Sequence, residues 1–170
     1  ISLREKDELL TEVHHRVKNN LQVITSLLNL QARQIKDPAT LAAFDLARNR
    51  VQSIALIHEL LYRSGSFSAV DLGPYVERLV ADLVRLYGAQ KRIEVEVTNQ
   101  GARLELQRAV PFGLLLNELV SNCCKHAFPG SRRGKIRVAV AREGDELTLD
   151  VEDNGIGLPV GFDERATNSL

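Results

Sequence analysis

Residues 3–34 contain neither proline nor glycine, and apolar residues recur in them at steps of three and four. The apolar positions are Leu10, Val13, Val17, Leu21, Ile24 and Leu28. Such spacing places the apolar side chains on one side of a helix. We therefore predict one long amphipathic helix, which must bury its apolar stripe against a partner.

A second helix is expected to start at Asp37-Pro38, because a capping residue followed by proline is a helix start signal. Its apolar stripe is Leu41, Phe44, Ala47, Val51, Ile54 and Leu61, and Ser64-Gly65-Ser66 ends it. Two such helices form an antiparallel hairpin. We expect the hairpin to pair into a four-helix bundle in a homodimer; the alternative is packing on the rest of its own chain.

The pattern becomes mixed after residue 65, which predicts domains at 1–65 and 66–170. Helices are expected at about 74–87 and 109–128. Strands are expected at 93–97, 135–142 and 146–152, with a turn at 143–145. The strands at 135–142 and 146–152 alternate apolar and polar residues, as in a half-buried antiparallel sheet covered by helices. The second domain is thus predicted to be an α+β two-layer sandwich.

Charge and composition give few hints of function. Lys+Arg and Asp+Glu both total 22, so net charge favours neither nucleic acid nor an anionic membrane. The sequence contains no run of about 18 apolar residues, the length that a membrane-spanning helix needs. The cysteines, Cys123 and Cys124, are adjacent in a predicted helix, which disfavours a disulfide. We expect a cytoplasmic region whose function resides in local sites.

The first helix carries two histidines. With 100° per residue, His14 borders the apolar stripe and His15 faces water. Glu12 and Asn19 lie three residues before and four after His15, within reach of its side chain. A carboxylate there can fix the imidazole tautomer and leave the other nitrogen free for attack. An exposed histidine alone is otherwise an ordinary surface residue.

Two further groups of residues suggest a nucleotide site. Glu118, Asn122 and Lys125 form one row on the helix at 109–128, suited to Mg²⁺ held by oxygens and to phosphate. Asp153 follows a strand and can accept a bond from an exocyclic amine, and Gly155 and Gly157 allow close backbone approach. The alternatives are an exposed charged helix face and a simple turn.

Residues 9–33 resemble the phosphoacceptor segment of the second histidine-kinase A class, whose motif His-Arg-x-Lys-Asn matches residues 15–19. The resemblance implies that His15 is phosphorylated. Arg16, Lys18 and Asn19 would flank the phosphoryl group. A related class carries a Trp-Glu pair, and this chain has no tryptophan, which favours the second class.

Residues 117–127 and 153–159 resemble the N-box and first glycine box of the Bergerat ATPase fold of gyrase, the heat-shock ninety chaperone, histidine kinases and a mismatch-repair protein. The resemblance implies these roles: Mg²⁺ coordination by Asn122, with Glu118 beside metal and phosphates; phosphate contact by Lys125 and His126; adenine recognition by Asp153; and shaping of the pocket and lid by Gly155 and Gly157. A second glycine box, a last strand and a closing helix are expected beyond Leu170.

The resulting hypothesis is an ATP-dependent kinase that phosphorylates its own His15 and passes the phosphoryl group to an aspartate of a response regulator. Glu12 would orient or deprotonate His15. Asn19 would position a water for the reverse reaction or hydrogen-bond to the phosphoryl group. An upstream sensor domain is expected. The alternatives are a non-enzymatic dimerisation scaffold and a serine kinase of the anti-sigma type.

Overall fold

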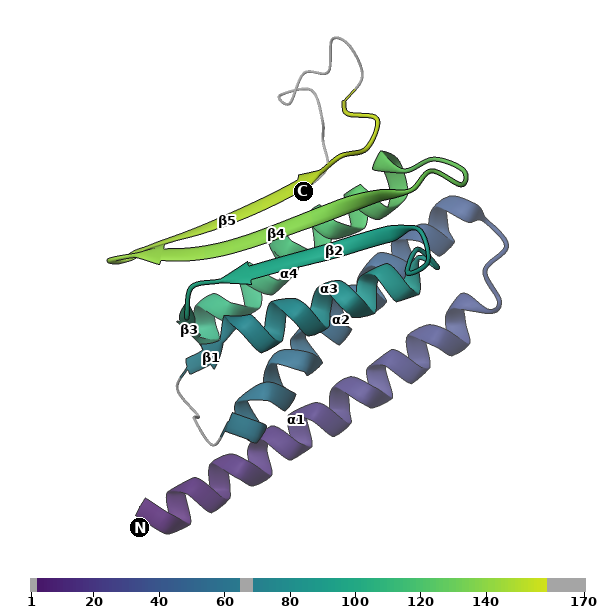
Figure 1. The fold of residues 1–170 in the computed structure, drawn as a ribbon. Helices are drawn as coiled ribbons and strands as arrows, with labels where there is room; N and C mark the ends of the chain where they lie inside the picture. Colours follow the sequence, from purple (N-terminus) through teal and green to yellow (C-terminus); the bar gives the residue numbers. More distant parts are fainter. Residues whose placement is uncertain (1–2, 65–68, 159–170) are drawn as a thin grey trace.

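The computed structural model describes residues 3–64 and 69–158 (Figure 1). Helices α1 (Leu3–Ala32) and α2 (Pro38–Ser64) form the predicted antiparallel hairpin. Asp37 caps α2 as expected, because its carboxylate accepts bonds from the Thr40 hydroxyl and from the Thr40 N–H at 2.8 Å. The hydrogen bond from the Thr40 hydroxyl is the main cause that holds the pKa of Asp37 below its usual value, and the bond from the Thr40 N–H adds to it. The predicted helix end at Gly65 lies outside the described residues.

The rest of the chain alternates strands and helices. In order, its elements are β1 (Ala69–Asp71), α3 (Leu72–Leu86), β2 (Ile93–Asn99), β3 (Arg103–Glu105), α4 (Leu106–Asn122), the π-helical turn η1 (Cys123–Ala127), β4 (Gly134–Glu143) and β5 (Glu146–Asp153). The predicted helices and strands are confirmed, with small shifts at their ends. The short antiparallel pair β1–β3 was not predicted, because three residues show no clear period.

The larger sheet has the strand order β2-β4-β5. Strands β4 and β5 are antiparallel around a turn in which Gly144 has φ +60°. Strand β2, however, runs parallel to β4, with Ile93 opposite Gly134. The expected antiparallel sheet of the strands at 135–142 and 146–152 is confirmed, whereas the parallel pairing of β2 with β4 was not predicted. The chain returns from β2 to β4 through α4, and such a crossover joins parallel strands.

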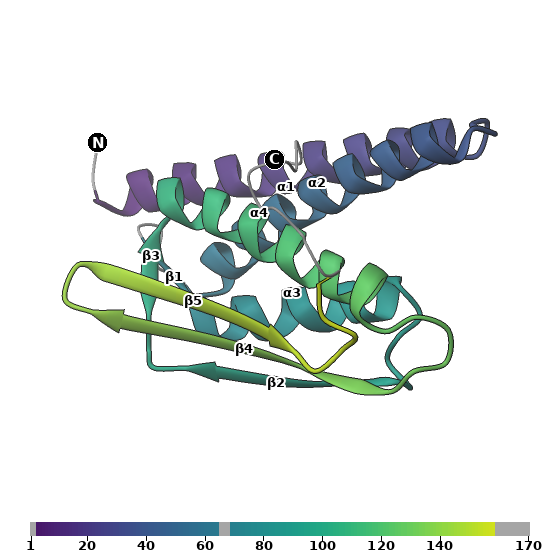
Figure 2. The same ribbon diagram turned by 90° about the horizontal axis from the view of Figure 1, so that it is seen from above.

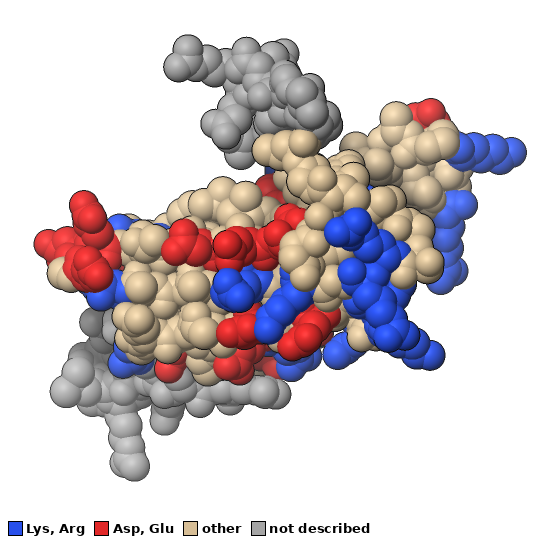
Figure 3. Space-filling view, turned by 45° about the horizontal axis from the view of Figure 1, so that its top comes forward, with Lys and Arg blue, Asp and Glu red and all other residues tan. Residues whose placement is uncertain are grey.

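The elements stack in three layers, which Figure 2 shows as the hairpin, then α3 and α4, then the sheet. Val138 and Val140 of β4 point into the core beneath the helices and are buried. The outer face of the sheet carries ion pairs, among them Lys135 with Glu96 and Arg137 with Glu152. Acidic and basic side chains accordingly mix over the strands in Figure 3. Within the described ranges, no helix is both long and apolar enough to cross a bilayer.

Helix α2 packs on the second half of its own chain, which is the alternative that we considered beside packing in a dimer. Its Ile57 is fully buried in the same core cluster as Val70 and Leu116. The hydrophobic core thus crosses the proposed boundary at residues 65 and 66, which remains a prediction. Three members of the predicted α1 stripe, Val17, Leu21 and Leu28, are half-buried.

A neighbouring face of α1 carries apolar residues that the structure leaves exposed. They are Leu9, Val13, Val23, Ile24, Leu27 and Leu30, each at least 43% exposed. Val13 and Ile24 were expected in the buried stripe and lie outside it. We call this set the outer stripe of α1. It is an apolar face without cover in a single copy of the chain.

Helices α3 and α4 approach closely at Gly113, where a Cβ atom would lie 1.8 Å from the Tyr75 hydroxyl oxygen. We predict that Gly113→Ala lowers the free energy of unfolding by about 1–3 kcal/mol through overpacking. This loss outweighs the gain of about 1 kcal/mol or less in helix propensity. Urea unfolding followed by circular dichroism measures the change.

Tyr75→Phe provides the control, since the Tyr75 hydroxyl is buried without a hydrogen-bond partner among the described residues. Burial also raises the pKa of this hydroxyl. Removing it should be neutral or stabilising. The double variant with Gly113→Ala should lose less stability than Gly113→Ala alone. An equal loss in both would show that the hydroxyl is not the source of the clash.

Candidate acceptor histidine and nucleotide site

The candidate acceptor lies on the solvent side of α1. His15 and Asn19 are both exposed. Glu12 Oε1 accepts a bond from Arg16 Nε at 2.7 Å, so the carboxylate predicted to serve His15 has a bond to the next turn. Such an exposed pair is worth at most about 1 kcal/mol and exchanges easily. The side chain of His14 lies outside the described set.

Lys18 of the same motif turns the other way, toward α2. Its Nζ atom lies 3.9 Å from Glu59 Oε2. This contact marks the register between the helices: the turn that follows His15 lies beside the last third of α2. Of the residues predicted to flank the phosphoryl group, Arg16 and Asn19 are exposed and Lys18 is half-buried.

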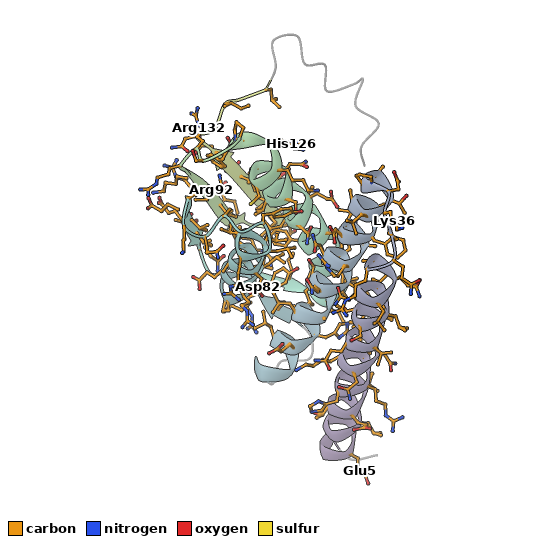
Figure 4. The ribbon with its side chains drawn as sticks, turned by 90° about the vertical axis from the view of Figure 1, so that its right-hand side faces the viewer. Glu5, Lys36, Asp82, Arg92, His126 and Arg132 are labelled. Carbon is orange, nitrogen blue, oxygen red and sulfur yellow. The ribbon has the colours of Figure 1, made fainter. Side chains whose placement is uncertain are left out.

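The N-box residues lie at the end of α4 and in η1. Glu118 pairs with Arg50 of α2, and both bonds, at 3.0 and 3.1 Å, reach its Oε1 atom. Asn122 is exposed at the last position of α4. Lys125 Nζ lies 5.6 Å from the centre of the Tyr87 ring, a cation–π distance. His126 is exposed, and Figure 4 shows it at the end of the molecule where the hairpin turns at Lys36.

The π-helical turn was not predicted. Its wider spiral shifts Lys125 and His126 away from the row that an α-helix would have continued from Glu118 and Asn122. Turns of this kind occur often at functional sites. Adjacent polar residues in a helical pattern give no signal for one, since the spacing still resembles an α-helix.

Asp153 ends β5 beside the start of η1. Its Oδ1 atom accepts a bond from the Gly155 N–H at 2.9 Å. Burial, and next the charge and hydrogen bonding of the Asp153 carboxylate, raise the pKa of Cys123 to about 12. The carboxylate thus adjoins the first residue of the π turn. The two ATPase motifs, about thirty residues apart in sequence, meet in one place.

The loop after Asp153 is fastened to its surroundings at several points. Asn154 Oδ1 accepts a bond from the Lys135 N–H at 2.7 Å, and the Ile156 N–H donates to the Ala127 carbonyl at 3.0 Å. A Cβ atom on Gly155 would lie 2.3 Å from that same carbonyl oxygen, so only glycine fits there. Gly157 has φ +73°, which also favours glycine.

The oxygen donors here fit Mg²⁺ in a limited way. Asn122 offers a carboxamide oxygen, and Glu118 has its Oε2 atom outside the bonds to Arg50. Among residues 3–64 and 69–158 there is no cluster of three His, Cys, Asp or Glu side chains able to hold a metal. Mg²⁺ bound with a nucleotide needs only one or two protein oxygens, because phosphates and waters supply the others.

His15 is far from the nucleotide motifs in this arrangement. Lys18 lies beside Glu59, whereas Glu118 pairs with Arg50, nine residues earlier in α2. Nine residues correspond to about 13 Å along a helix. His15 lies one turn beyond Lys18, and η1 lies toward the opposite end of the hairpin, so the full separation is larger (Figure 4).

Comparisons with known proteins match the two segments that contain these residues. Residues 12–87 match a family described as histidine kinase. Residues 107–168 match the family of histidine kinase-, DNA gyrase B- and HSP90-like ATPases. The chain is 34% identical to the sensor histidine kinase PdtaS of Mycobacterium tuberculosis, over 99% of this chain and 34% of PdtaS. It is 30% identical to blue-light-activated histidine kinase 2 of Erythrobacter litoralis, over 94% of this chain and 46% of that protein.

Solved structures show the same likeness. The histidine kinase domain of the Erythrobacter litoralis EL346 blue-light activated histidine kinase superposes with a TM-score of 0.66 and 28% identity, covering 98% of this chain and 78% of that one. The chain spans about a third of the length of PdtaS. It belongs to the sensor histidine kinases, as a transmitter region in which a histidine-kinase helical segment precedes a domain of the gyrase and HSP90-like ATPase family.

Proposed function

We propose that this region acts in the cytoplasm as an ATP-dependent protein-histidine kinase, which phosphorylates His15 and then a response regulator aspartate. The observation that carries the proposal is the contact between the loop after Asp153 and η1, where the Ile156 N–H donates to the Ala127 carbonyl at 3.0 Å. This contact brings the carboxylate that we assign to adenine next to the N-box. An upstream sensor segment would control it, in keeping with the greater length of the relatives.

In the proposed reaction, an imidazole nitrogen of His15 attacks the γ-phosphorus of ATP. The bond from that phosphorus to the β,γ-bridging oxygen breaks, ADP leaves, and the imidazole proton passes to a base. Glu12 is the candidate base, once it exchanges its bond with Arg16. Asn122 and the Oε2 atom of Glu118 would hold Mg²⁺, which when bound supplies charge neutralisation at the phosphates. Lys125, released from Tyr87, would reach the phosphates as well.

Transfer to His15 needs a different arrangement from the one described, because more than about 13 Å along α2 separates the two sites. Either α4 leaves its position on α2, or His15 of a second copy approaches the nucleotide. The contact between α4 and α2 includes buried polar groups, among them the bond from Asn117 to Ser53 at 2.9 Å. Polar groups at this interface can form hydrogen bonds with water when the helices separate, so α4 could leave α2 at a moderate cost in free energy.

Homodimerisation through the hairpin is part of the proposal. The outer stripe of α1 offers an apolar surface that runs along most of the helix. A second copy would bury it in a four-helix arrangement. The outer stripe and His15 lie on the same helix, so the proposed dimer interface would run next to the acceptor site.

The response regulator would approach His15 from the solvent side, where Asn19 is exposed one turn later. Asn19 could hold a water against the phosphorylated regulator, or bond to the phosphoryl group on His15. Loss of regulator dephosphorylation by Asn19→Ala, with autophosphorylation intact, would support the first role. Unchanged dephosphorylation would exclude it.

We predict that His15→Ala abolishes autophosphorylation while ATP binding and the unfolding midpoint stay near those of the parent, because an exposed helix position tolerates alanine. Incubation with γ-labelled ATP, followed by acid treatment, measures this. The parent's label should be acid-labile, as phosphohistidine is. Acid-stable label would indicate a serine kinase, and no label a scaffold. Label that persists in His15→Ala and disappears in His14→Ala would move the acceptor to His14.

Asp153→Ala and Asn122→Ala should both abolish kinase activity, but by different routes. Asp153→Ala should weaken binding of both ATP and adenosine, since it removes a bond to the base. Asn122→Ala should weaken binding of Mg-ATP and leave adenosine binding unchanged. Calorimetric titrations with the two ligands separate these effects. Parental adenosine affinity in Asp153→Ala would refute the adenine assignment.

The dimer proposal is tested by charges in the outer stripe. Val23→Glu combined with Leu27→Glu should shift the chain from dimer to monomer in sedimentation velocity, because buried unpaired carboxylates are costly. Gln22→Glu combined with Ser26→Glu provides the charge-matched control, since both positions are exposed and polar and line the pocket between α1, α2 and α3 instead of the outer stripe. An identical effect of both pairs would mean that the stripe is not the interface.

A further inference from the structure

Arg132 is an exposed arginine in the loop between η1 and β4, and its guanidinium reaches the loop that follows Asp153. Its Nη2 atom donates to the carbonyl oxygens of Gly155 at 3.2 Å and Asn154 at 3.4 Å. Figure 4 shows Arg132 at the same end of the molecule as His126. Neither sequence motif includes this residue.

These two carbonyls belong to peptide groups that are held at both ends. In the Asn154–Gly155 peptide, the N–H donates to Asp153 Oδ1 and the C=O accepts from Arg132. The Asp153 carboxylate therefore receives its bond from a peptide whose opposite end Arg132 holds. Glycine makes rotation of such a peptide easy, so the orientation depends on these bonds.

The next peptide repeats the arrangement. The Ile156 N–H donates to the Ala127 carbonyl at 3.0 Å, and the Gly155 C=O accepts from Arg132. One arginine thus holds both carbonyls, while η1 and Asp153 hold the two N–H groups. A charged donor makes a stronger hydrogen bond to a carbonyl than a neutral donor does.

Arg132 is itself held in place by a second arginine. Arg92 Nη1 donates to the carbonyls of Gly130 at 2.9 Å, Phe128 at 3.3 Å and Arg132 at 3.3 Å. These bonds fix the loop from which the Arg132 side chain extends. Arg92, next to the start of β2, thus holds the loop that carries Arg132, and Arg132 in turn holds the loop after β5.

We propose that Arg132 is a positioning residue of the nucleotide site: by holding the Asn154 and Gly155 carbonyls, it fixes the Gly155 N–H against Asp153 and so orients the carboxylate that receives the adenine amine. The inference rests on the proposed function. In this role Arg132 acts through Asp153 rather than on the phosphates. Its effect should therefore depend on the base and not on the number of phosphates.

The test is the affinity of Arg132→Ala for Mg-ATP and for adenosine, measured by calorimetry on the full chain. Both affinities should fall by about tenfold, as expected for the loss of one or two such bonds. Arg133→Ala is the matched control, because Arg133 is exposed and makes no side-chain bond within the described part of the chain. It should bind adenosine as the parent does. A loss in Arg132→Ala for Mg-ATP alone would mean phosphate attraction and overturn the proposal.

Kinetics and a double variant add independent readouts. In autophosphorylation, Arg132→Ala should raise the KM for ATP about tenfold with kcat within about twofold. In an Asp153→Ala background, Arg132→Ala should cost no further adenosine affinity, since residues that act as a unit are not additive. Additive losses would overturn the proposal. If Arg132→Ala does not fold, Arg132→Gln replaces it, and parental adenosine affinity in that variant would equally overturn it.

Failure of this inference is distinguishable from failure of the proposed function. If the parent binds neither ATP nor adenosine, the nucleotide site itself is wrong. If the parent binds both ligands and Asp153→Ala binds both more weakly while Arg132→Ala binds normally, only the role of Arg132 is wrong.

Discussion

The contact between α2 and α4 determines the relation between the two functional sites. Helix α2 lies along α1, which carries His15, and its other side packs on α4, which leads into the N-box. Ile57 at this contact is fully buried in the core of the second half. Because one helix contacts both partners, the positions of these contacts along α2, at Glu59 and Arg50, set the distance between His15 and the nucleotide motifs.

The polar part of that contact adds little stability. The Asn49 carboxamide is buried with no hydrogen-bond partner among the described residues, and an unsatisfied buried group costs about 1–3 kcal/mol. The Arg50–Glu118 pair is partly exposed, so its contribution is small. Apolar burial at Ile57 therefore holds the contact. Separation of α4 from α2 would let water reach Asn49 and would break the Arg50–Glu118 pair.

Periodic patterns predicted the long elements well, because buried faces of helices and strands repeat at fixed intervals. They could not predict the parallel pairing of β2 with β4, which depends on the path of the chain through α4. They also missed the bond between Glu118 and Arg50, residues 68 positions apart. Motif resemblance suggested Asp153 as a site residue but gave no hint of the bonds of Arg132, since a surface arginine carries no local signal of the carbonyls that it contacts.

The meeting of the two ATPase motifs follows from the topology of the second half. A short loop connects η1 to β4, so the start of β4 must lie near the end of the N-box. Strand β5 returns antiparallel to β4, and the register places Asp153 opposite Ile136, close to that start. The β4–β5 hairpin thus brings the chain back to the end of the sheet where β4 begins. Arg132, located in the short loop, lies beside Asp153 for the same geometric reason.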